Sequence, residues 1–287
     1  MAAGQGGDMT EQFLIMGATG VIGGRVMKAL SSAGCGVRGA SRSMTGPDWV
    51  KLDILDPATY ARALDGVTTV MLAARPGDEE SHVSAAPFIE TMRRSGVRRV
   101  VLLSALGAQL RPEFSLRKVE VLLEGSGLAW TFVRPNFFMQ MLGSPPLSSE
   151  IAALGALRLP AGRARIAYVH ADDVAAVLAR ALLDPGLAGR GLDVSGPRAL
   201  DHYEIASAIS GATRRDVRFA DLSEDEARLV FAERGLAKPQ VERLIRFYSL
   251  VRMGYCAVPD GGASALLGRP LIEFRDFADA SRAVWMK

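Results

Sequence analysis

Short apolar runs alternate with segments of helical periodicity along the first half of the chain. Such runs are typical of strands that are buried on both faces of a parallel sheet. The predicted strands cover residues 12–17, 36–41, 48–52, 68–74, 98–104 and 129–134, and the predicted helices cover 20–33, 57–64, 79–95 and 115–126. This order predicts an α/β fold with a doubly wound parallel sheet, because right-handed crossovers place helices on both faces.

The second half of the chain follows a different pattern. Pro135 is expected to end the strand 129–134, and the proline- and glycine-containing segment 143–163 is expected to be rich in loops. A strand at 165–169, a helix at 171–184, a strand at 191–195 and a mostly helical region at 201–253 are predicted beyond it. We therefore divide the chain into a disordered lead at 1–11, a core at 12–142, and a mixed region at 143–287. The mixed region is expected to complete the core and to form a smaller C-terminal lobe.

Composition places the chain among globular proteins. Of its 287 residues 49% are hydrophobic and 23% are charged, and no apolar run approaches the ~20 residues of a membrane-spanning helix. The net charge of +3 is small and the arginines are dispersed, so we expect neither nucleic acid nor a membrane as a partner. Residues 1–11 lack the apolar core of a secretory signal, which fits a cytoplasmic location. Cys35 and Cys256 indicate neither a disulfide framework nor a metal site.

A glycine-rich turn joins the first predicted strand to the first predicted helix. Its pattern is Gly17-x-x-Gly20-x-x-Gly23, and the residues between that we expect at the ligand are Thr19, Val21 and Ile22. A strand, a tight glycine turn and a helix N-terminus together form a pyrophosphate site, because backbone N–H groups and the positive helix end point at the ligand. The motif therefore predicts a Rossmann-type dinucleotide-binding core at 12–142. The alternative is an ordinary βα turn without a ligand.

The end of the second strand indicates which nicotinamide cofactor is used. Sites that prefer NAD place a carboxylate there, but this chain has Ser41-Arg42-Ser43 and no acid. Arg42 is able to bind a 2′-phosphate, so we expect NADPH, unless Arg42 is simply a solvated arginine. Asp53 is expected either to accept from the adenine amino group or to cap the turn near Asp56. The small side chains of Ala73 and Ala74 would let the cofactor ribose approach closely.

The reaction end of the predicted site carries motifs that resemble the short-chain dehydrogenase/reductase superfamily, and its atypical NmrA-like branch more closely. The matching segments are Gly17 to Gly23, Ser104 to Ala108, Lys118 with Glu120, Ser126 to Leu128, Arg134 to Met139, and Tyr168 to Ala175. The resemblance covers nearly the whole chain, as far as Gly268 to Pro270 and Phe274 to Ala278. It implies a cofactor-dependent reductase, since the branch contains NADPH-dependent quinone reductases and antibiotic tailoring reductases. The branch also contains a transcriptional co-regulator that only senses dinucleotide.

The resemblance implies roles for three residues and reveals one departure. Lys118 falls on the position of the family's active lysine, which binds the nicotinamide ribose, and Ser104 falls on the position of its serine. Pro135 is expected beside the cofactor. Phe114 stands four residues before Lys118, where the family has its catalytic tyrosine, and phenylalanine has no proton to give. The alternative for Lys118 is a solvated helix lysine that pairs with nearby acids.

Three interpretations follow from the missing tyrosine. A quinone or a ketone beside a phenol needs no acid from the protein, because water or the phenol supplies the proton. Alternatively, another side chain donates it, and Tyr168, His170 and Ser104 are the candidates. Tyr168 is as readily explained by packing, His170 by a backbone bond near Asp172, and Ser104 by substrate orientation. In the third interpretation the protein is not an enzyme and senses dinucleotide.

The residues expected on the substrate side are apolar or aromatic. They are Phe114, Asn136, Phe137, Phe138 and Tyr168, although Phe137 and Phe138 also fit a plain core. Aromatic side chains suit a flat, apolar ligand. We therefore predict an NADPH-dependent reductase of a polycyclic aromatic ketone or quinone, of the natural-product tailoring type. A non-catalytic NADP(H) sensor is the alternative, and the oligomeric state is left open.

Overall fold

The computed structural model describes residues 11–75 and 77–286. The chain divides into two compact units: unit 1 comprises Met1–Arg134 and Ala175–Leu192, and unit 2 comprises Pro135–Val174 and Asp193–Lys287. Of the lead expected to be disordered at 1–11, only Glu11 lies among the described residues.

A seven-stranded sheet in the order β3-β2-β1-β4-β5-β6-β8 organises unit 1. The strands are β1 Gln12–Ile15, β2 Gly36–Ser41, β3 Trp49–Lys51, β4 Thr69–Ala73, β5 Arg99–Leu103, β6 Ala129–Pro135 and β8 Arg190–Val194. The pairing is parallel from β3 to β6, with Phe13 of β1 opposite both Val37 of β2 and Thr69 of β4. The strands β2 and β3 lie on one side of β1, and β4, β5, β6 and β8 lie on the other, which is the strand order of a doubly wound sheet. The predicted α/β class with a parallel sheet is confirmed.

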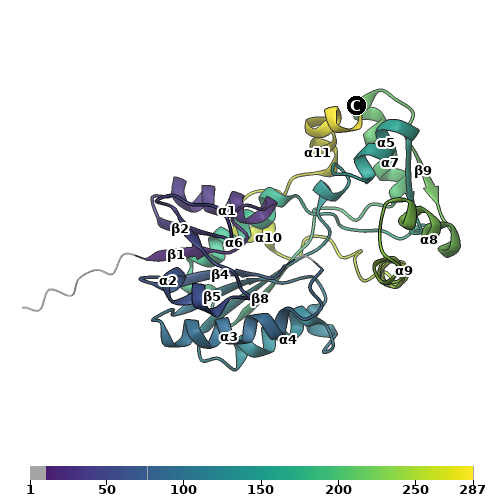
Figure 1. Ribbon diagram of the computed structural model, residues 1–287. Helices are drawn as coiled ribbons and strands as arrows, with labels where there is room; N and C mark the ends of the chain where they lie inside the picture. Colours follow the sequence, from purple (N-terminus) through teal and green to yellow (C-terminus); the bar gives the residue numbers. More distant parts are fainter. Residues whose placement is uncertain (1–10, 76, 287) are drawn as a thin grey trace, which may run out of the picture. The chain divides into compact units, whose positions relative to one another are not determined.

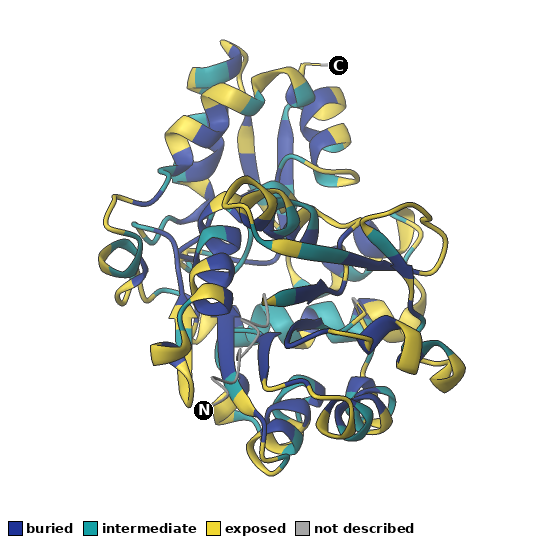
Figure 2. Ribbon diagram, turned by 90° about the vertical axis from the view of Figure 1, so that its left-hand side faces the viewer, coloured by how far each residue is buried: buried dark blue, intermediate teal, exposed yellow. Residues whose placement is uncertain are grey.

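Helices cover both faces of this sheet. They are α1 Val21–Ser32, α2 Tyr60–Leu64, α3 Ser81–Arg94, α4 Ser115–Glu124 and α6 Ala171–Leu183, with short 3₁₀ turns η1 Pro57–Thr59, η2 Ala108–Leu110 and η4 Pro185–Leu187. Figure 1 shows α3 and α4 side by side on one face, with α1 and α6 on the other. The residues of β1, β4, β5 and β6 are mostly buried, and the dark strands in Figure 2 show this burial, whereas the edge strand β8 is largely exposed. Such burial requires the apolar runs that the sequence displays.

Unit 2 has a core of its own around a parallel two-stranded sheet of β7 Ala156–Leu159 and β9 Arg218–Asp221. Its helices are α5 Leu147–Leu154, α7 His202–Thr213, α8 Glu224–Glu233, α9 Lys238–Arg252, α10 Ala263–Leu267 and α11 Phe274–Ser281, with η3 Met139–Met141 and η5 Arg282–Trp285. Trp285 is fully buried, and its indole Nε1 donates to the Leu142 carbonyl at 2.8 Å.

One expectation about this half of the chain, the strand at 165–169, was wrong, and two others were incomplete. Segment 143–163 holds α5 and β7 rather than loop alone, because Ile151, Leu157 and Leu159 are buried in the unit 2 core. Segment 165–169 is not a strand and makes only isolated bridges, for example from Ile166 to Leu200. Region 201–253 is mostly helical as expected, with α7, α8 and α9, but it also contains β9. The partner of β9 is β7, which is distant in sequence, and a local pattern does not register such pairing.

Candidate active site

The glycine turn after β1 adopts the geometry that its sequence predicts. Gly17 has a φ of +67°, which favours glycine, and its carbonyl accepts the amide of Gly20 at 2.8 Å. A Cβ added at Gly23 would lie 2.2 Å from the Gly17 carbonyl oxygen, so only glycine lets α1 pack this close to the turn. The loop therefore requires glycine at position 17 because of its positive φ, and at position 23 because of the close approach of the helix.

The residues expected at the cofactor divide by exposure. Gly17, Thr19, Gly20 and Val21 are exposed, whereas Ile22 and Gly23 are buried beneath them. Gly20 is the N-cap of α1 and no side chain caps this end of the helix. The first turn of α1 therefore leaves N–H groups directed outward, an arrangement that fits a dinucleotide pyrophosphate. Ile22 contributes through packing.

Arg42 lies directly after β2 and is exposed. The Ser41 hydroxyl oxygen accepts the amides of Ser43 at 3.2 Å and Met44 at 3.1 Å, which fixes the turn that carries Arg42. Within the described part of the chain, the Arg42 side chain makes no hydrogen bond or ion pair. Its guanidinium donors are therefore available to a ligand phosphate.

Asp53 follows β3 and stabilises a turn. Its Oδ1 accepts the amide of Leu55 at 3.0 Å, whereas the cap near Pro57 comes from Asp56, whose Oδ1 accepts the amide of Ala58 at 3.1 Å. The contact of Asp53 with adenine stays a prediction.

Ala73 and Ala74 end β4 beside the glycine turn. A Cβ added at Gly17 would lie 3.8 Å from the Ala73 Cβ. A small cavity lies here, and its walls include Ile54, both alanines, and Ser81 and Ser84 of α3. The small side chains thus leave space at the carboxyl edge of the sheet, where ligands of this fold bind.

Ser104 follows β5 and is tied to a buried carboxylate. Its hydroxyl donates to Glu120 Oε1 at 2.7 Å, and Arg134 of β6 donates from Nε to Oε1 at 2.8 Å and from Nη2 to Oε2 at 2.9 Å. Arg117 adds a bond to Oε2 at 3.0 Å, and Glu120 is fully buried. Burial raises the pKa of Glu120, but the bonds from Arg134 and Ser104 outweigh it and hold the pKa below its ordinary value. In this arrangement Ser104 has no hydrogen left for a substrate and can only accept.

Phe114 and Lys118 lie one helical turn apart at the start of α4. Phe114 is the N-cap residue, and the amide of Lys118 donates to its carbonyl at 3.1 Å. The two side chains therefore leave the same side of the helix. The ammonium of Lys118 makes no hydrogen bond or ion pair with any residue that the structure describes. The geometry fits a lysine that is available to the ribose hydroxyls of a nicotinamide cofactor.

The remaining predicted residues belong to unit 2. Pro135 ends β6 and is buried. Asn136 is also buried, and its amide Nδ2 donates to Ser195 Oγ at 3.2 Å and to the Cys256 carbonyl at 3.0 Å. Its Oδ1 accepts the amide of Phe137 at 2.9 Å, so both the donors and the acceptor of the Asn136 side chain are bonded within unit 2.

The aromatic residues of unit 2 form one cluster. The ring of Phe137 lies 4.8 Å from that of Phe247 and 6.0 Å from that of Tyr168. The Tyr168 hydroxyl bonds His202 Nε2 at 3.0 Å, and burial raises the tyrosine pKa well above its ordinary value. Phe138 bridges to Val169 and is half-buried. Tyr168 therefore has a structural partner in His202 within unit 2.

The roles of two residues at the site, Glu120 and Arg111, were not predicted in the sequence analysis. Glu120 appeared there only as part of a motif, although it lies among Ser115, Val119 and Leu123 on the buried face of α4. A carboxylate on an apolar helix face is a signal for a paired buried charge. Arg111, whose guanidinium lies over the Phe114 ring at 4.5 Å from the centroid, had no recognised signal.

The described residues show neither a cluster with metal ligands nor a helix long and apolar enough to cross a membrane.

Comparisons with known proteins indicate the family and its cofactor. A family model described as NAD(P)H-binding matches residues 17–185. The (4-alkanoyl-5-oxo-2,5-dihydrofuran-3-yl)methyl phosphate reductase of Streptomyces griseus is 33% identical over 92% of this chain and 96% of its own length. NAD(P)H azoreductase of Xenophilus azovorans is 29% identical over 95% of this chain and 98% of its own.

A solved structure shows the same fold. The NADPH-dependent quinone oxidoreductase of Escherichia coli, in complex with NADPH, superimposes with a TM-score of 0.82 at 22% identity, and the match covers 94% of this chain and 99% of that one. The family match agrees with the glycine turn, the exposed end of α1 and the sheet order. The chain therefore belongs to the NAD(P)H-binding family, and it is an NAD(P)H-dependent oxidoreductase with a Rossmann-type fold.

Proposed function

We propose that the protein uses NADPH to reduce a carbonyl group of a polycyclic aromatic ketone or quinone. The observation that carries this proposal is the pair formed by Phe114 and Lys118 at the start of α4. Lys118 keeps an ammonium that no other described residue binds, whereas Phe114 offers a flat apolar ring and no proton. The site thus retains a cofactor anchor and lacks the usual acid, which suits substrates that need no acid from the protein.

The preference for NADPH rests on Arg42. Its exposed guanidinium follows β2, where a 2′-phosphate would meet it, and no acidic residue stands beside it in Ser41-Arg42-Ser43. A guanidinium forms charge-assisted bonds with phosphate oxygens, whereas NADH offers only a hydroxyl there.

The roles proposed for the chain's own residues in the reduction are these. NADPH supplies the hydride when it is bound. Lys118 would hold the ribose and add positive potential. The Ser104 hydrogen is directed to Glu120, so the Ser104 oxygen would accept a hydrogen bond only from a substrate that carries a donor, such as a phenol hydroxyl. For a quinone, hydride and one proton from water give the hydroquinone and NADP⁺. For a ketone beside a phenol, the phenol supplies the proton to the carbonyl oxygen.

The relatives support the chemical class. One is named for reducing an alkanoyl-oxo-dihydrofuran phosphate, another for azo compounds, and the structural neighbour for quinones. All three names describe conjugated electron acceptors. We extend the proposal to a tailoring role in the cytoplasm, acting on a small aromatic natural product such as an antibiotic precursor.

The test follows NADPH oxidation by the purified protein with 1,4-naphthoquinone and with two matched ketones, 1-hydroxy-2-acetonaphthone and 2-acetonaphthone. We expect oxidation with the quinone and with the hydroxyketone, and much slower oxidation with the ketone that lacks the phenol. Equal rates for the two ketones would show that the phenol supplies no proton. Tight NADPH binding without oxidation by any of the three compounds would instead support the alternative of an NADP(H) sensor.

A further inference from the structure

Arg111 stands at the same site, over the residue that replaces the family's tyrosine. Its guanidinium lies 4.5 Å from the centroid of the Phe114 ring. The amide of Phe114 donates to the Arg111 carbonyl at 2.9 Å, which closes the turn between η2 and α4. Arg111, Phe114 and Lys118 thus lie on successive turns of one continuous segment of unit 1.

The charge of Arg111 is not neutralised within the described part of the chain. Its half-buried side chain makes no ion pair or hydrogen bond there. The neighbouring Arg117, by contrast, is bound to Glu120 and Glu124, at 3.0 and 2.8 Å. The proposed function assigns Lys118 to the cofactor ribose, so within the described part of this segment Arg111 is the cation that remains available to an anion of the substrate.

We propose that Arg111 binds an anionic substituent of the substrate, such as a carboxylate, sulfonate or phosphate; this rests on the proposed reductase function. Stacking on Phe114 occupies one face of the guanidinium and limits its orientations, while the N–H donors along its edge stay free. Those donors match the oxygens of a planar or tetrahedral anion. Phe114 then acts as the platform that positions this cation.

The direct test measures binding without turnover. Calorimetry on the protein saturated with NADP⁺ compares naphthalene-2-sulfonate and naphthalene-2-carboxylate with the neutral naphthalene-2-methanol. We expect both anions to bind at least about tenfold more tightly than the alcohol, because tenfold corresponds to about 1.4 kcal/mol, close to the lower limit for one charge-assisted bond. Added salt should reduce that preference.

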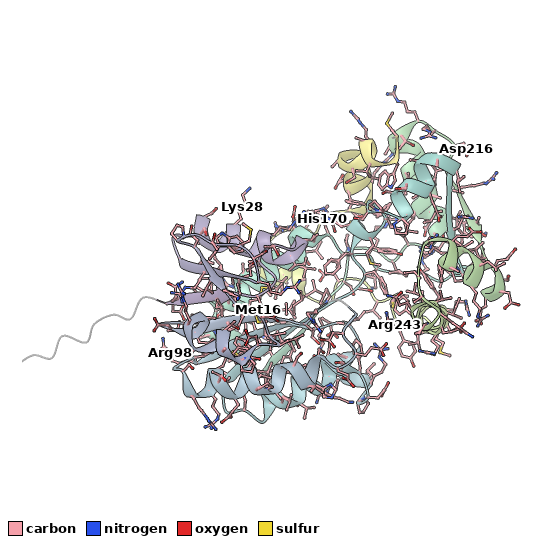
Figure 3. All side chains as sticks on the ribbon, in the orientation of Figure 1. Met16, Lys28, Arg98, His170, Asp216 and Arg243 are labelled. Atoms are coloured by element: carbon pink, nitrogen blue, oxygen red, sulfur yellow. The ribbon has the colours of Figure 1, made fainter. Side chains whose placement is uncertain are left out.

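Two variants and one control assign the preference to Arg111. We expect Arg111→Ala to abolish it, and Phe114→Leu, which removes the platform but keeps the charge, to reduce it. Arg98→Ala serves as the matched control, because Arg98 is exposed and precedes β5, at the opposite edge of the sheet from the site. Figure 3 shows Arg98 at that edge and Met16, which follows β1, toward the other. Circular dichroism confirms that each variant is folded.

Turnover separates this inference from the proposed function. The ratio of kcat/KM for 1,4-naphthoquinone-2-sulfonate to that for 1,4-naphthoquinone should fall about tenfold in Arg111→Ala and stay unchanged in Arg98→Ala. Anion preference without oxidation of either quinone would support the Arg111 site and contradict quinone reduction. Equal binding of the anions and the alcohol, or a preference that survives Arg111→Ala, would overturn the inference whatever the turnover.

Discussion

Glu120 and Arg134 form a two-bond ion pair in the interior of unit 1. The guanidinium reaches both carboxylate oxygens, at 2.8 and 2.9 Å, and Glu120 has no exposed surface. Because Ser104 donates to the same carboxylate, the pair connects α4 with β6 and with the end of β5. Ser104 of the candidate active site is thus held by a buried carboxylate.

Glu120→Ala should lower the free energy of unfolding by about 3–5 kcal/mol, because it leaves Arg134 buried without its counter-charge. Glu124→Ala is the control. Glu124 is partly exposed, and among the described residues its ion pair is with Arg117, so its loss should cost at most about 1 kcal/mol. Urea unfolding followed by circular dichroism measures both. Equal effects of the two substitutions would contradict the structural role given to the pair.

Lys118→Ala should weaken NADPH binding by about ten- to a hundredfold and lower turnover, because it removes charge-assisted bonds to the cofactor. Fluorescence titration with NADPH and the rate of NADPH oxidation report the two effects. Lys28→Ala, at an exposed position of α1, should leave both unchanged. Unchanged kinetics in Lys118→Ala would remove this lysine from the mechanism.

Phe114→Tyr should restore a proton donor beside Lys118. We expect turnover of 2-acetonaphthone to rise by up to about 10²–10⁴-fold, the range of general acid catalysis, with little change for 1-hydroxy-2-acetonaphthone. Phe114→Leu, which provides no hydroxyl, is the control. A similar rise for both ketones would argue against the substrate phenol as the proton source.

Arg42→Ala should lower the preference for NADPH over NADH at least about tenfold, because only NADPH carries the 2′-phosphate that the guanidinium binds. Dissociation constants for both cofactors give this ratio, and binding of NADH should change little. Arg62→Ala, at an exposed position of α2, is the comparison variant. A preference that persists in Arg42→Ala would place the phosphate contact elsewhere.

His202 should make the protein sensitive to mild acid. Burial lowers its pKa from 6.5 to about 4, although the charge of Asp201 opposes this shift. Below pH 6.5 the imidazole of His202 is protonated in the unfolded chain, whereas in the folded protein it stays neutral until the pH reaches about 4. The folded state therefore loses stability as the pH falls from 6.5 towards 4. Between pH 7 and pH 5 we expect a loss of roughly 2 kcal/mol from this residue.

Urea unfolding at both pH values measures that loss. His202→Phe should abolish most of the acid sensitivity, since it removes the titrating group from the core of unit 2, whereas His82→Gln should retain it. The same pH dependence in wild type and His202→Phe would show that other groups dominate.

The sequence by itself determined the sheet, the glycine turn and the positions of Phe114 and Lys118. These features are local: a run such as Phe13–Ile15 must be buried on both faces, and Gly17 must adopt a positive φ. Spacing also fixed that Phe114 and Lys118 share one side of a helix. Such properties follow from residues close together in the chain, which is why they were predictable.

Only the tertiary structure decided what each polar side chain contacts. Asn136 bonds the carbonyl of Cys256, 120 residues away, and the Tyr168 hydroxyl bonds His202 rather than staying open. The sequence likewise did not predict the pairing of β7 with β9 or the contact of the Arg111 guanidinium with the Phe114 ring. A hydrogen bond or a ring contact depends on distances of a few ångströms between segments. The chain's local pattern fixes which faces are buried, and packing fixes which partners meet there.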